Sequence, residues 1–169
     1  DVQIWGIEAD YKYHFSERNK GLSFTASASY VVGENQTDDE RLDSVNPFTA
    51  ISTFEYKFPN NKFSVSLTNT YVGVPTPSDT YKKGQEDRRG NFNPATAYIP
   101  DSFITTDLSL NYKASERFSA NLGIYNLFDT TYYLWSDLRS NGISGNDDDA
   151  YQRYAQPGTS LKAGFKWRF

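Results

Sequence analysis

Apolar and polar residues alternate along most of this chain, which is the pattern of β-strands with one apolar face. In residues 161–169 every odd position is apolar, and three of the four even positions carry a positive charge. The same alternation predicts six further strands, at residues 3–14, 22–32, 53–58, 63–71, 104–113 and 118–125. Most of these runs approach the roughly 9–11 residues that a tilted strand needs to cross a bilayer, whereas strands of soluble proteins average about five or six.

The connections between the predicted strands alternate strictly between short and long. Short turns are expected at residues 16–21, 59–62 and 114–117, and long loops at residues 33–49, 73–103 and 127–159. Every second connection of an up-and-down barrel lies on the same side of the membrane, so this sorting predicts short periplasmic turns and long extracellular loops. Aromatic residues such as Phe58, Phe63 and Trp167 flank the short turns, and Tyr30 and Tyr71 lie at the opposite strand ends, as in two aromatic girdles.

These patterns predict an all-β fold, an antiparallel up-and-down transmembrane β-barrel. A soluble all-β domain with one buried face would explain the alternation but not the sorting of the loops or the strand length. Single-chain bacterial barrels have an even number of strands, and an open sheet would leave unpaired edges in lipid. We therefore expect residues 1–169 to be the last seven strands of a larger barrel, with the earlier strands absent.

Composition narrows the classes of protein further. Mean hydropathy is -0.69, and no apolar run approaches the roughly 18 residues of a transmembrane helix. Aromatic residues make up 17% of the chain, which is unlike a disordered segment. Cysteine is absent, which excludes thiolate sites, and a net charge of -4 without a basic cluster argues against nucleic acid as a partner.

Three segments carry a resemblance to a known family. They are the Pro-Gly-led final strand at residues 157–169, the Asn-Leu-Phe-Asp run within residues 122–129 that leads into Tyr132 and Tyr133, and the Gly-Ile-Glu core of residues 5–11. Together they resemble the C-terminal third of TonB-dependent receptors of the Gram-negative outer membrane. The resemblance implies a barrel of about twenty-two strands around an N-terminal plug, with the plug and the segment that contacts the TonB complex in the missing N-terminal part.

Within this family, three further segments resemble the heme and hemoglobin receptor branch: residues 46–48, residues 135–139, and residues 153–158. This resemblance implies import of heme or hemoglobin-derived iron, with heme as a transported ligand rather than a covalently bound cofactor, and a heme-carrying protein as a partner. A siderophore receptor and, further away, a passive porin are the alternatives. Heme-ligating histidines would lie upstream, because His14 is expected to be a polar residue of the barrel interior.

Two groups of residues are candidates for function. Phe165, Trp167 and Phe169 on the final strand are expected to act in barrel assembly, as well as to face lipid. The last long loop is rich in aromatic and Arg side chains, the types enriched at binding hot spots. The possible ligand contacts there are Tyr132, Tyr133, Trp135, Arg139, Arg153 and Tyr154. Alternatively, these side chains pack the loop on itself.

No catalytic or metal site is predicted. The single histidine has no suggestive nucleophile or carboxylate pair beside it, and there is no phosphate-binding loop. The run of Asp147, Asp148 and Asp149 lacks the spaced ligands of a calcium loop and is expected to be a solvated tip. Cations of the interior face, such as Lys57 and Lys166, are expected to form ion-pair ladders with Glu55 and Asp107 or to contact the plug.

Overall fold

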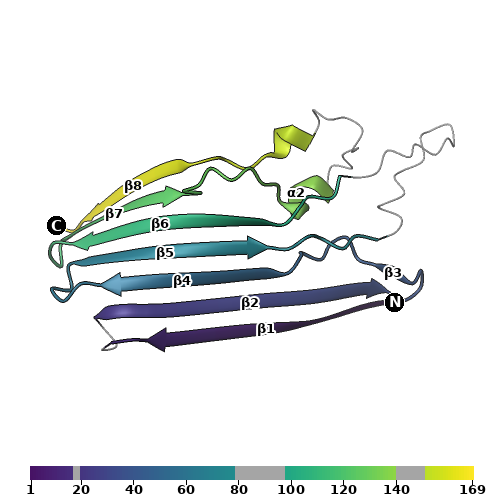
Figure 1. Ribbon diagram of the computed structural model, residues 1–169, viewed down its shortest axis with the longest axis horizontal. Helices are drawn as coiled ribbons and strands as arrows, with labels where there is room; N and C mark the ends of the chain where they lie inside the picture. The colour runs from purple at the N-terminus through teal and green to yellow at the C-terminus, as the bar shows by residue number, and fades with distance from the viewer. Residues whose placement is uncertain (17–19, 79–97, 140–150) are drawn as a thin grey trace.

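The computed structural model describes residues 1–16, 20–78, 98–139 and 151–169. Nearly all of the regular structure in these residues is β-strand, as the alternating pattern predicts (Figure 1). The strands are β1 Val2–His14, β2 Gly21–Asn35, β3 Glu40–Arg41, β4 Thr49–Lys57, β5 Phe63–Val72, β6 Phe103–Lys113, β7 Phe118–Tyr125 and β8 Ser160–Trp167. Two short helices, α2 Trp135–Arg139 and the 3-10 helix η1 Tyr151–Tyr154, lie in the last long loop.

Each long strand pairs with its neighbours in sequence. The order across the sheet is β1-β2-β4-β5-β6-β7-β8, every pairing is antiparallel, and the short strand β3 pairs with the end of β2. The register is continuous, so that Ala28, for example, lies opposite Ala9 on one side and Ala50 on the other. This arrangement confirms the predicted all-β, up-and-down antiparallel architecture. The sheet is curved but open, with β1 and β8 as its edges (Figure 1).

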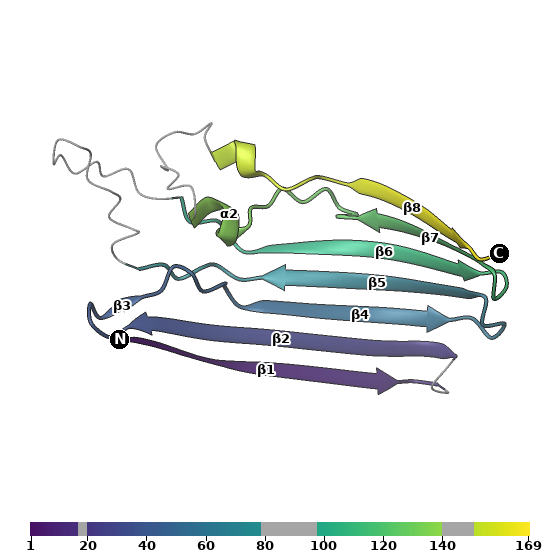
Figure 2. The same ribbon diagram turned by 180° about the vertical axis from the view of Figure 1, so that it is seen from behind.

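The short turns and the long loops lie at opposite ends of the sheet (Figures 1 and 2). The C-terminus is at the end with the short turns, and the N-terminus is at the end with the long loops. In the turn between β4 and β5, Asn61 takes a left-handed conformation with φ 55, and the Asn60 carboxamide accepts a 2.9 Å hydrogen bond from the Lys62 amide. Asparagine tolerates this conformation well, so the tight turn follows from its sequence.

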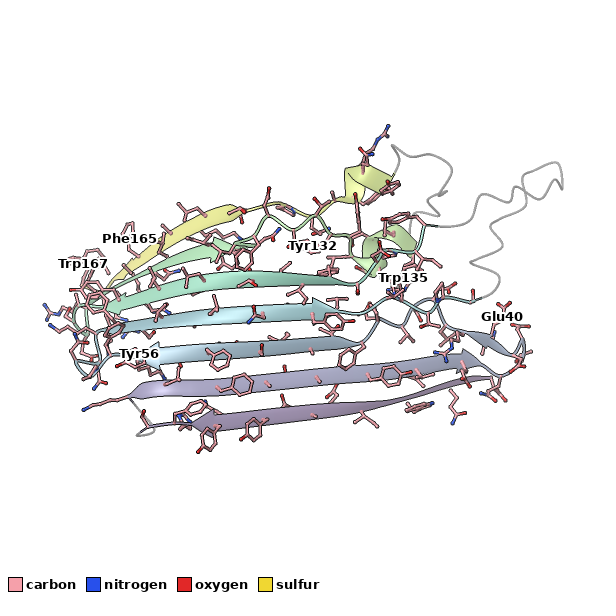
Figure 3. All side chains as sticks on the ribbon, in the orientation of Figure 1. Glu40, Tyr56, Tyr132, Trp135, Phe165 and Trp167 are labelled. Atoms are coloured by element: carbon pink, nitrogen blue, oxygen red, sulfur yellow. The ribbon has the colours of Figure 1, made fainter. Side chains whose placement is uncertain are left out.

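The apolar face of the sheet has no protein layer over it. The buried hydrophobic residues of the described part are Val32, Trp135 and Leu138, far fewer than a soluble domain of this size needs. By contrast, large apolar side chains stand exposed along every long strand, up to 81% for Phe165 (Figure 3). An uncovered apolar face of this extent marks contact with another apolar phase, and it fits a membrane. None of the helices in the described ranges is long and apolar enough to cross a bilayer.

Three details of the sequence-based prediction are wrong. Strand β4 begins at Thr49 rather than at residue 53, because its register with β2 continues to Ser29. Strand β3, in the first long loop, was not expected; it exists because Glu40 and Arg41 pair with the end of β2. The final strand ends at Trp167 rather than at residue 169, since its partner β7 begins at Phe118.

The expected ion-pair ladders do not form between strands of the described part. Its two ion pairs are Lys57 with Glu55, two residues apart on β4 at 3.3 Å, and Lys113 with Glu116 at 2.7 Å. The carboxylate of Asp107 instead accepts a hydrogen bond from the Asn126 amide at 2.8 Å. Lys162 of β8 makes a cation-π contact instead, with its amine 4.9 Å from the centroid of the Tyr125 ring.

Candidate ligand-binding loops

The Asn-Leu-Phe-Asp run forms a hydrogen-bonded turn where β7 enters the last long loop. Asn126 is only 4% exposed and takes a left-handed conformation with φ 51. Its carboxamide accepts a bond from the Thr130 amide at 2.9 Å and donates to the carbonyls of Thr130 at 2.8 Å and Pro157 at 3.3 Å. The backbone amide of Asn126 donates a hydrogen bond to the Asp107 carboxylate, and this bond fixes the turn to strand β6. We call this arrangement the Asn126 clasp.

The other end of the same loop joins the clasp through Asp129 and Thr159. The Asp129 carboxylate accepts a 2.9 Å bond from the Thr159 amide, and the Thr159 hydroxyl donates to the Asn126 carbonyl at 2.8 Å. A Cβ atom on Gly158 would clash with the Asp129 carboxylate oxygen, so this position requires glycine as long as Asp129 keeps its place. The Asn-Leu-Phe-Asp and Pro-Gly motifs therefore meet in space and close the base of the loop.

Helix α2 is packed into the loops rather than displayed on them. Trp135 is 4% exposed and Leu138 is fully buried, while Ser136 and Asp137 are half-buried. Figure 3 shows Trp135 at the loop end of the sheet, near the first long loop. Its indole Nε1 donates a 2.8 Å hydrogen bond to the carbonyl oxygen of Asp43, and Arg139 Nη1 donates to the same oxygen at 2.8 Å. One carbonyl of the first long loop thus holds both ends of α2.

Asp43 also holds the start of the second long loop. Its carboxylate accepts a 2.7 Å bond from the Ser78 amide and a 3.1 Å bond from the Ser78 hydroxyl. The four residues Asp43, Ser78, Trp135 and Arg139 form what we call the Asp43 junction. Because they come from three loops, separated by up to 96 residues, the junction fixes the described parts of these loops relative to one another.

The segments at residues 135–139 and 153–158 lie against each other. Gln156 Nε2 donates to the Asp137 carboxylate at 3.0 Å, and the Gln156 amide donates to the Tyr132 carbonyl at 2.9 Å. Tyr133 and Ala155 form an isolated antiparallel bridge. The two halves of the last long loop are therefore paired, which keeps α2 next to η1.

Three tyrosines gather beside these helices. Tyr98 stacks on Tyr151 with ring centroids 4.2 Å apart, and Tyr133 meets both rings edge-on at 5.6 and 5.5 Å. Burial raises the pKa of Tyr98, and the neighbouring Tyr133, Tyr151 and Asp101 raise it further. Burial likewise raises the pKa of Tyr133. The raised pKa values keep the phenols of Tyr98 and Tyr133 uncharged at neutral pH, so these rings offer apolar area and a hydroxyl group without charge.

The six predicted ligand contacts have different environments. Trp135 is buried, and Arg153 on η1 is exposed. The other four are half-buried: Tyr132, Tyr133, Arg139 and Tyr154. The Tyr132 ring lies on Phe103, with centroids 4.4 Å apart, and burial raises the pKa of its phenol. The acidic run at residues 147–149 lies outside the described residues.

The sequence does not indicate the structural role of four residues in this region. Asp43, Ser78 and Tyr98 act through contacts far away in sequence, which no local pattern reports. Asn126 belongs to the Asn-Leu-Phe-Asp motif, but the motif alone does not predict the hydrogen bonds of the clasp. A polar residue at the end of an alternating strand, followed three residues later by Asp129, was the available signal of a hydrogen-bonded turn.

The predicted assembly residues lie on the apolar face near the end with the short turns. Phe165 and Trp167 are on strand β8, and Trp167 meets Phe118 of β7 edge-on at 5.6 Å (Figure 3). Phe169 follows the strand and is fully exposed. As for metals, the described ranges contain no group of three or more His, Cys, Asp or Glu side chains placed to hold an ion.

Comparison with known proteins decides the family. The model of the TonB-dependent receptor-like β-barrel family matches residues 1–127. The chain belongs to this family. Its members are receptors of the Gram-negative outer membrane, so the apolar face of this TonB-dependent receptor chain faces lipid and the other face lines the barrel interior.

Several curated relatives are similar over most of the chain. Hemoglobin-binding protein A of Haemophilus influenzae is 24% identical over 98% of the chain and 17% of its own length. Hemoglobin-haptoglobin utilization protein B of Neisseria meningitidis is 24% identical over 89% of the chain and 19% of its own length. The hemin receptor of Yersinia enterocolitica is 26% identical over 89% of the chain and 20% of its own length. The chain thus spans about a fifth of the relatives it matches.

Solved structures have the same fold. The copper transporter OprC superposes with a TM-score of 0.74 at 20% identity, covering 99% of this chain and 23% of its own. The FrpB iron transporter from Neisseria meningitidis gives a TM-score of 0.69 at 20% identity, covering 99% of this chain and 24% of its own. These superpositions show that the described sheet has the form of part of a TonB-dependent barrel.

Proposed function

We propose that this chain is part of a receptor that imports heme or hemoglobin-derived iron across the outer membrane, driven by the TonB system. The observation that carries the proposal is the similarity to receptors named for hemoglobin and hemin, which extends over 89–98% of the chain and so includes the last long loop. These relatives are named as binding proteins and receptors, which favours transport over catalysis. Heme is in this proposal a transported ligand, carried to the receptor by a heme-carrying protein.

The long loops would form the ligand-binding surface. The Asp43 junction and the Asn126 clasp hold the described loop segments together, and a pre-organised surface loses less entropy when it binds. Arg153 is the predicted contact with an exposed charge, and a guanidinium can bind a carboxylate such as a heme propionate through two hydrogen bonds. Tyr132, Tyr133 and Tyr154 would add aromatic contact area. Trp135 and Arg139 would act by holding α2 in place.

The remaining partners belong to the same system. The chain corresponds to about a fifth of its relatives, and β1 and β8 are the edges of an open sheet, which favours pairing with further strands of the same barrel. A plug inside the barrel and the TonB complex would complete the transporter. The exposed aromatic side chains of Phe165, Trp167 and Phe169 support a role of the last strand in barrel assembly, since they lie on its lipid face beside an unpaired edge.

Growth on defined iron sources tests the proposal. The whole receptor is produced in a strain that lacks other heme receptors, with hemin, hemoglobin or a ferric siderophore as the sole iron source. We expect growth on hemin and hemoglobin, lost when the TonB system is inactivated. Growth on the ferric siderophore alone would overturn the heme assignment, and growth that does not depend on TonB would indicate a passive pore.

Arg153→Gln tests the proposed contact. Because a charge-assisted hydrogen bond contributes about 1.5–3 kcal/mol, we expect this variant to weaken hemin or hemoglobin binding by roughly ten-fold or more. Arg41→Gln is the matched control, since Arg41 is also an exposed arginine at the loop end. Equal effects of the two substitutions would show that overall charge, rather than Arg153, matters.

A further inference from the structure

A hollow lies on the lipid face of the sheet, in the half next to the long loops. Its volume is about 570 Å³, within the usual range of ligand sites. The small and polar side chains of the lipid face that line it are Ala9, Ala26, Ala28, Ala50, Ser52 and Asn69. We call this cavity the alanine hollow.

The alanine hollow exists because two neighbouring rows of the lipid face carry small side chains. Paired residues of adjacent strands share a face, so Ala9, Ala28 and Ala50 form one row, and Ala26 and Ser52 belong to the next. The rows on either side of these two are bulky. Their members on β1, β2 and β4 are Ile7, Tyr30, Tyr13, Phe24 and Phe54. The lipid face of a barrel is convex, so the depth of the hollow comes from these differences in side-chain size.

The strands beneath the hollow have their neighbours in place. The hollow extends over β1, β2, β4, β5 and β6, and of these β1 alone is an edge of the sheet. A further strand paired with β1 would extend the surface beyond Ala9 and would leave the floor at Ala28 and Ala50 unchanged. The shape of the hollow therefore does not depend on the sheet being open.

The hollow has a polar end at Asn69 of β5. Asn69 lies on the lipid face between Leu67 and Tyr71 and is half-buried. Its carboxamide oxygen accepts a 2.8 Å hydrogen bond from the Thr106 hydroxyl, and Thr106 is only 5% exposed. Within the described residues, the amide nitrogen of Asn69 has no hydrogen-bond partner. An unpaired donor is unfavourable in hydrocarbon, so this nitrogen favours an occupant that brings an acceptor.

The position of Asn69 indicates the chemistry of the occupant. Asn69 is two residues, or about 7 Å, from Tyr71 in the girdle on the loop side. With the long loops extracellular, this is the level at which the chains of an outer-leaflet lipid join its head group. From Asn69 to Ala9 the hollow crosses three strand spacings, or about 14 Å. One leaflet of a hydrocarbon core about 30 Å thick has nearly the same depth.

We propose that the alanine hollow binds an acyl chain of lipopolysaccharide, and that a carbonyl group of the ester or amide link of this chain accepts a hydrogen bond from Asn69. Lipopolysaccharide forms the outer leaflet of the Gram-negative outer membrane, and its acyl chains are attached through both kinds of link. The hollow is continuous with the lipid face of this receptor chain. A flat protein surface would rest on the flanking aromatic rings, whereas a single acyl chain fits between them.

This site goes beyond the proposed function, since neither heme nor the loops take part in it. Native mass spectrometry of the whole receptor in a mild detergent tests it. The receptor is mixed with purified lipopolysaccharide that lacks O-antigen or, separately, with phosphatidylethanolamine at the same concentration. We expect lipopolysaccharide to remain bound and phosphatidylethanolamine to be retained several-fold less. Equal retention of the two lipids would overturn the proposal, as would a lipid-free receptor dimer that Ala28→Phe dissociates.

Two substitutions locate the bound lipid. Ala28→Phe fills the hollow, and Asn69→Leu keeps a side chain of similar size but removes the donor, so we expect each to lower lipopolysaccharide retention several-fold. Ala163→Phe is the matched control, because Ala163 is an exposed alanine on the lipid face of β8, outside the hollow, and it should leave retention unchanged. Unchanged retention in either Ala28→Phe or Asn69→Leu would contradict the proposal. Heat-dependent migration in gel electrophoresis shows that each variant is folded, and the comparison of the two lipids on the unmodified receptor does not depend on any variant.

Discussion

The indole Nε1 of Trp135 donates a 2.8 Å hydrogen bond to the carbonyl oxygen of Asp43, which lies 92 residues earlier in the chain. Side chains of long loops usually contact residues of their own loop, but this contact joins the first long loop to the last. Consistent with this contact, Trp135 is almost completely buried although it lies in a long loop. The Trp135 side chain is therefore part of the framework on which the exposed loop residues are arranged.

Trp135→Phe should loosen the loops without affecting the sheet. The variant keeps an aromatic ring but loses the hydrogen bond to Asp43, so we expect the free energy of loop opening to fall by about 1 kcal/mol. Limited proteolysis of the folded receptor measures this as faster cleavage in the last long loop. Trp167→Phe, on the lipid face of β8, is the control and should leave the cleavage rate unchanged; equal rates for both variants would contradict the prediction.

Asp43→Ala should free the start of the second long loop. The Asp43 carboxylate accepts a 2.7 Å hydrogen bond from the backbone amide of Ser78. This bond slows the exchange of the amide hydrogen with solvent. Loss of a bond to a charged group costs about 1.5–3 kcal/mol, so exchange at Ser78 should become roughly ten-fold faster or more. Hydrogen–deuterium exchange followed by mass spectrometry reports the change. Asp101→Ala, another exposed acid near the loops, should not alter exchange at Ser78.

Substitutions of Asn126 separate its backbone conformation from its side-chain bonds. Asn126→Gly tolerates the left-handed conformation but loses the bonds to Thr130 and Pro157, so we expect the free energy of unfolding to fall by about 2 kcal/mol. Asn126→Ala should lose about 1–2 kcal/mol more, because alanine disfavours this conformation. Urea unfolding of the receptor in lipid vesicles measures both. An alanine variant as stable as the glycine variant would show that the backbone conformation is not a constraint.

Gly158→Ala should be harmful only while Asp129 is present. The added methyl group would displace the Asp129 carboxylate, which accepts a hydrogen bond from Thr159, and we expect a loss of about 1–2 kcal/mol. In an Asp129→Ala background the same substitution should cost much less, because the atom in its way is gone. A double-mutant cycle measured by urea unfolding gives this coupling. Additive effects would mean that Gly158 is required for some other reason.

Alkaline pH should weaken the tyrosine cluster. Burial raises the pKa of Tyr98 above its usual value of 10.0, so the folded loops hold the phenol proton more tightly than the unfolded chain does. The stabilisation is therefore fully present below about pH 10 and is lost as the pH rises through the raised pKa. Tyr98→Phe should make proteolysis of the loops less dependent on pH above about pH 10, and an unchanged pH dependence in this variant would contradict the prediction.

Most of the fold could be predicted from the sequence because a membrane strand repeats one simple pattern. Alternation at period two fixes which residues share a face, and the apolar face needs no partner layer whose packing would have to be guessed. The short strand β3 was missed because two residues carry no periodicity. Its pairing depends on the Leu42 amide bonding to the Gly33 carbonyl, which is a tertiary contact.

The loops were less predictable for a physical reason. The residue types show which loop is rich in aromatic and Arg side chains, but they do not show the partner of each side chain. Whether Trp135 faces a ligand or the protein is decided by the Asp43 carbonyl, which comes from another loop. Interior cations such as Lys57 and Lys166 are expected from the sequence to form ion-pair ladders or to contact the plug, yet Lys57 pairs within its own strand and Asp107 is engaged by Asn126.

The spacing of contacts along the chain has a consequence for the order of assembly. Every ladder between the long strands joins two that follow one another along the chain, so the long strands can be added to the sheet one after another. The contact between Asp43 and Trp135 is different, since strands β4 to β7 all lie between these two residues in the chain. The joined loops should therefore be the last part of the described structure to form, and their protection from protease would date the completion of the surface to which we assign ligand binding.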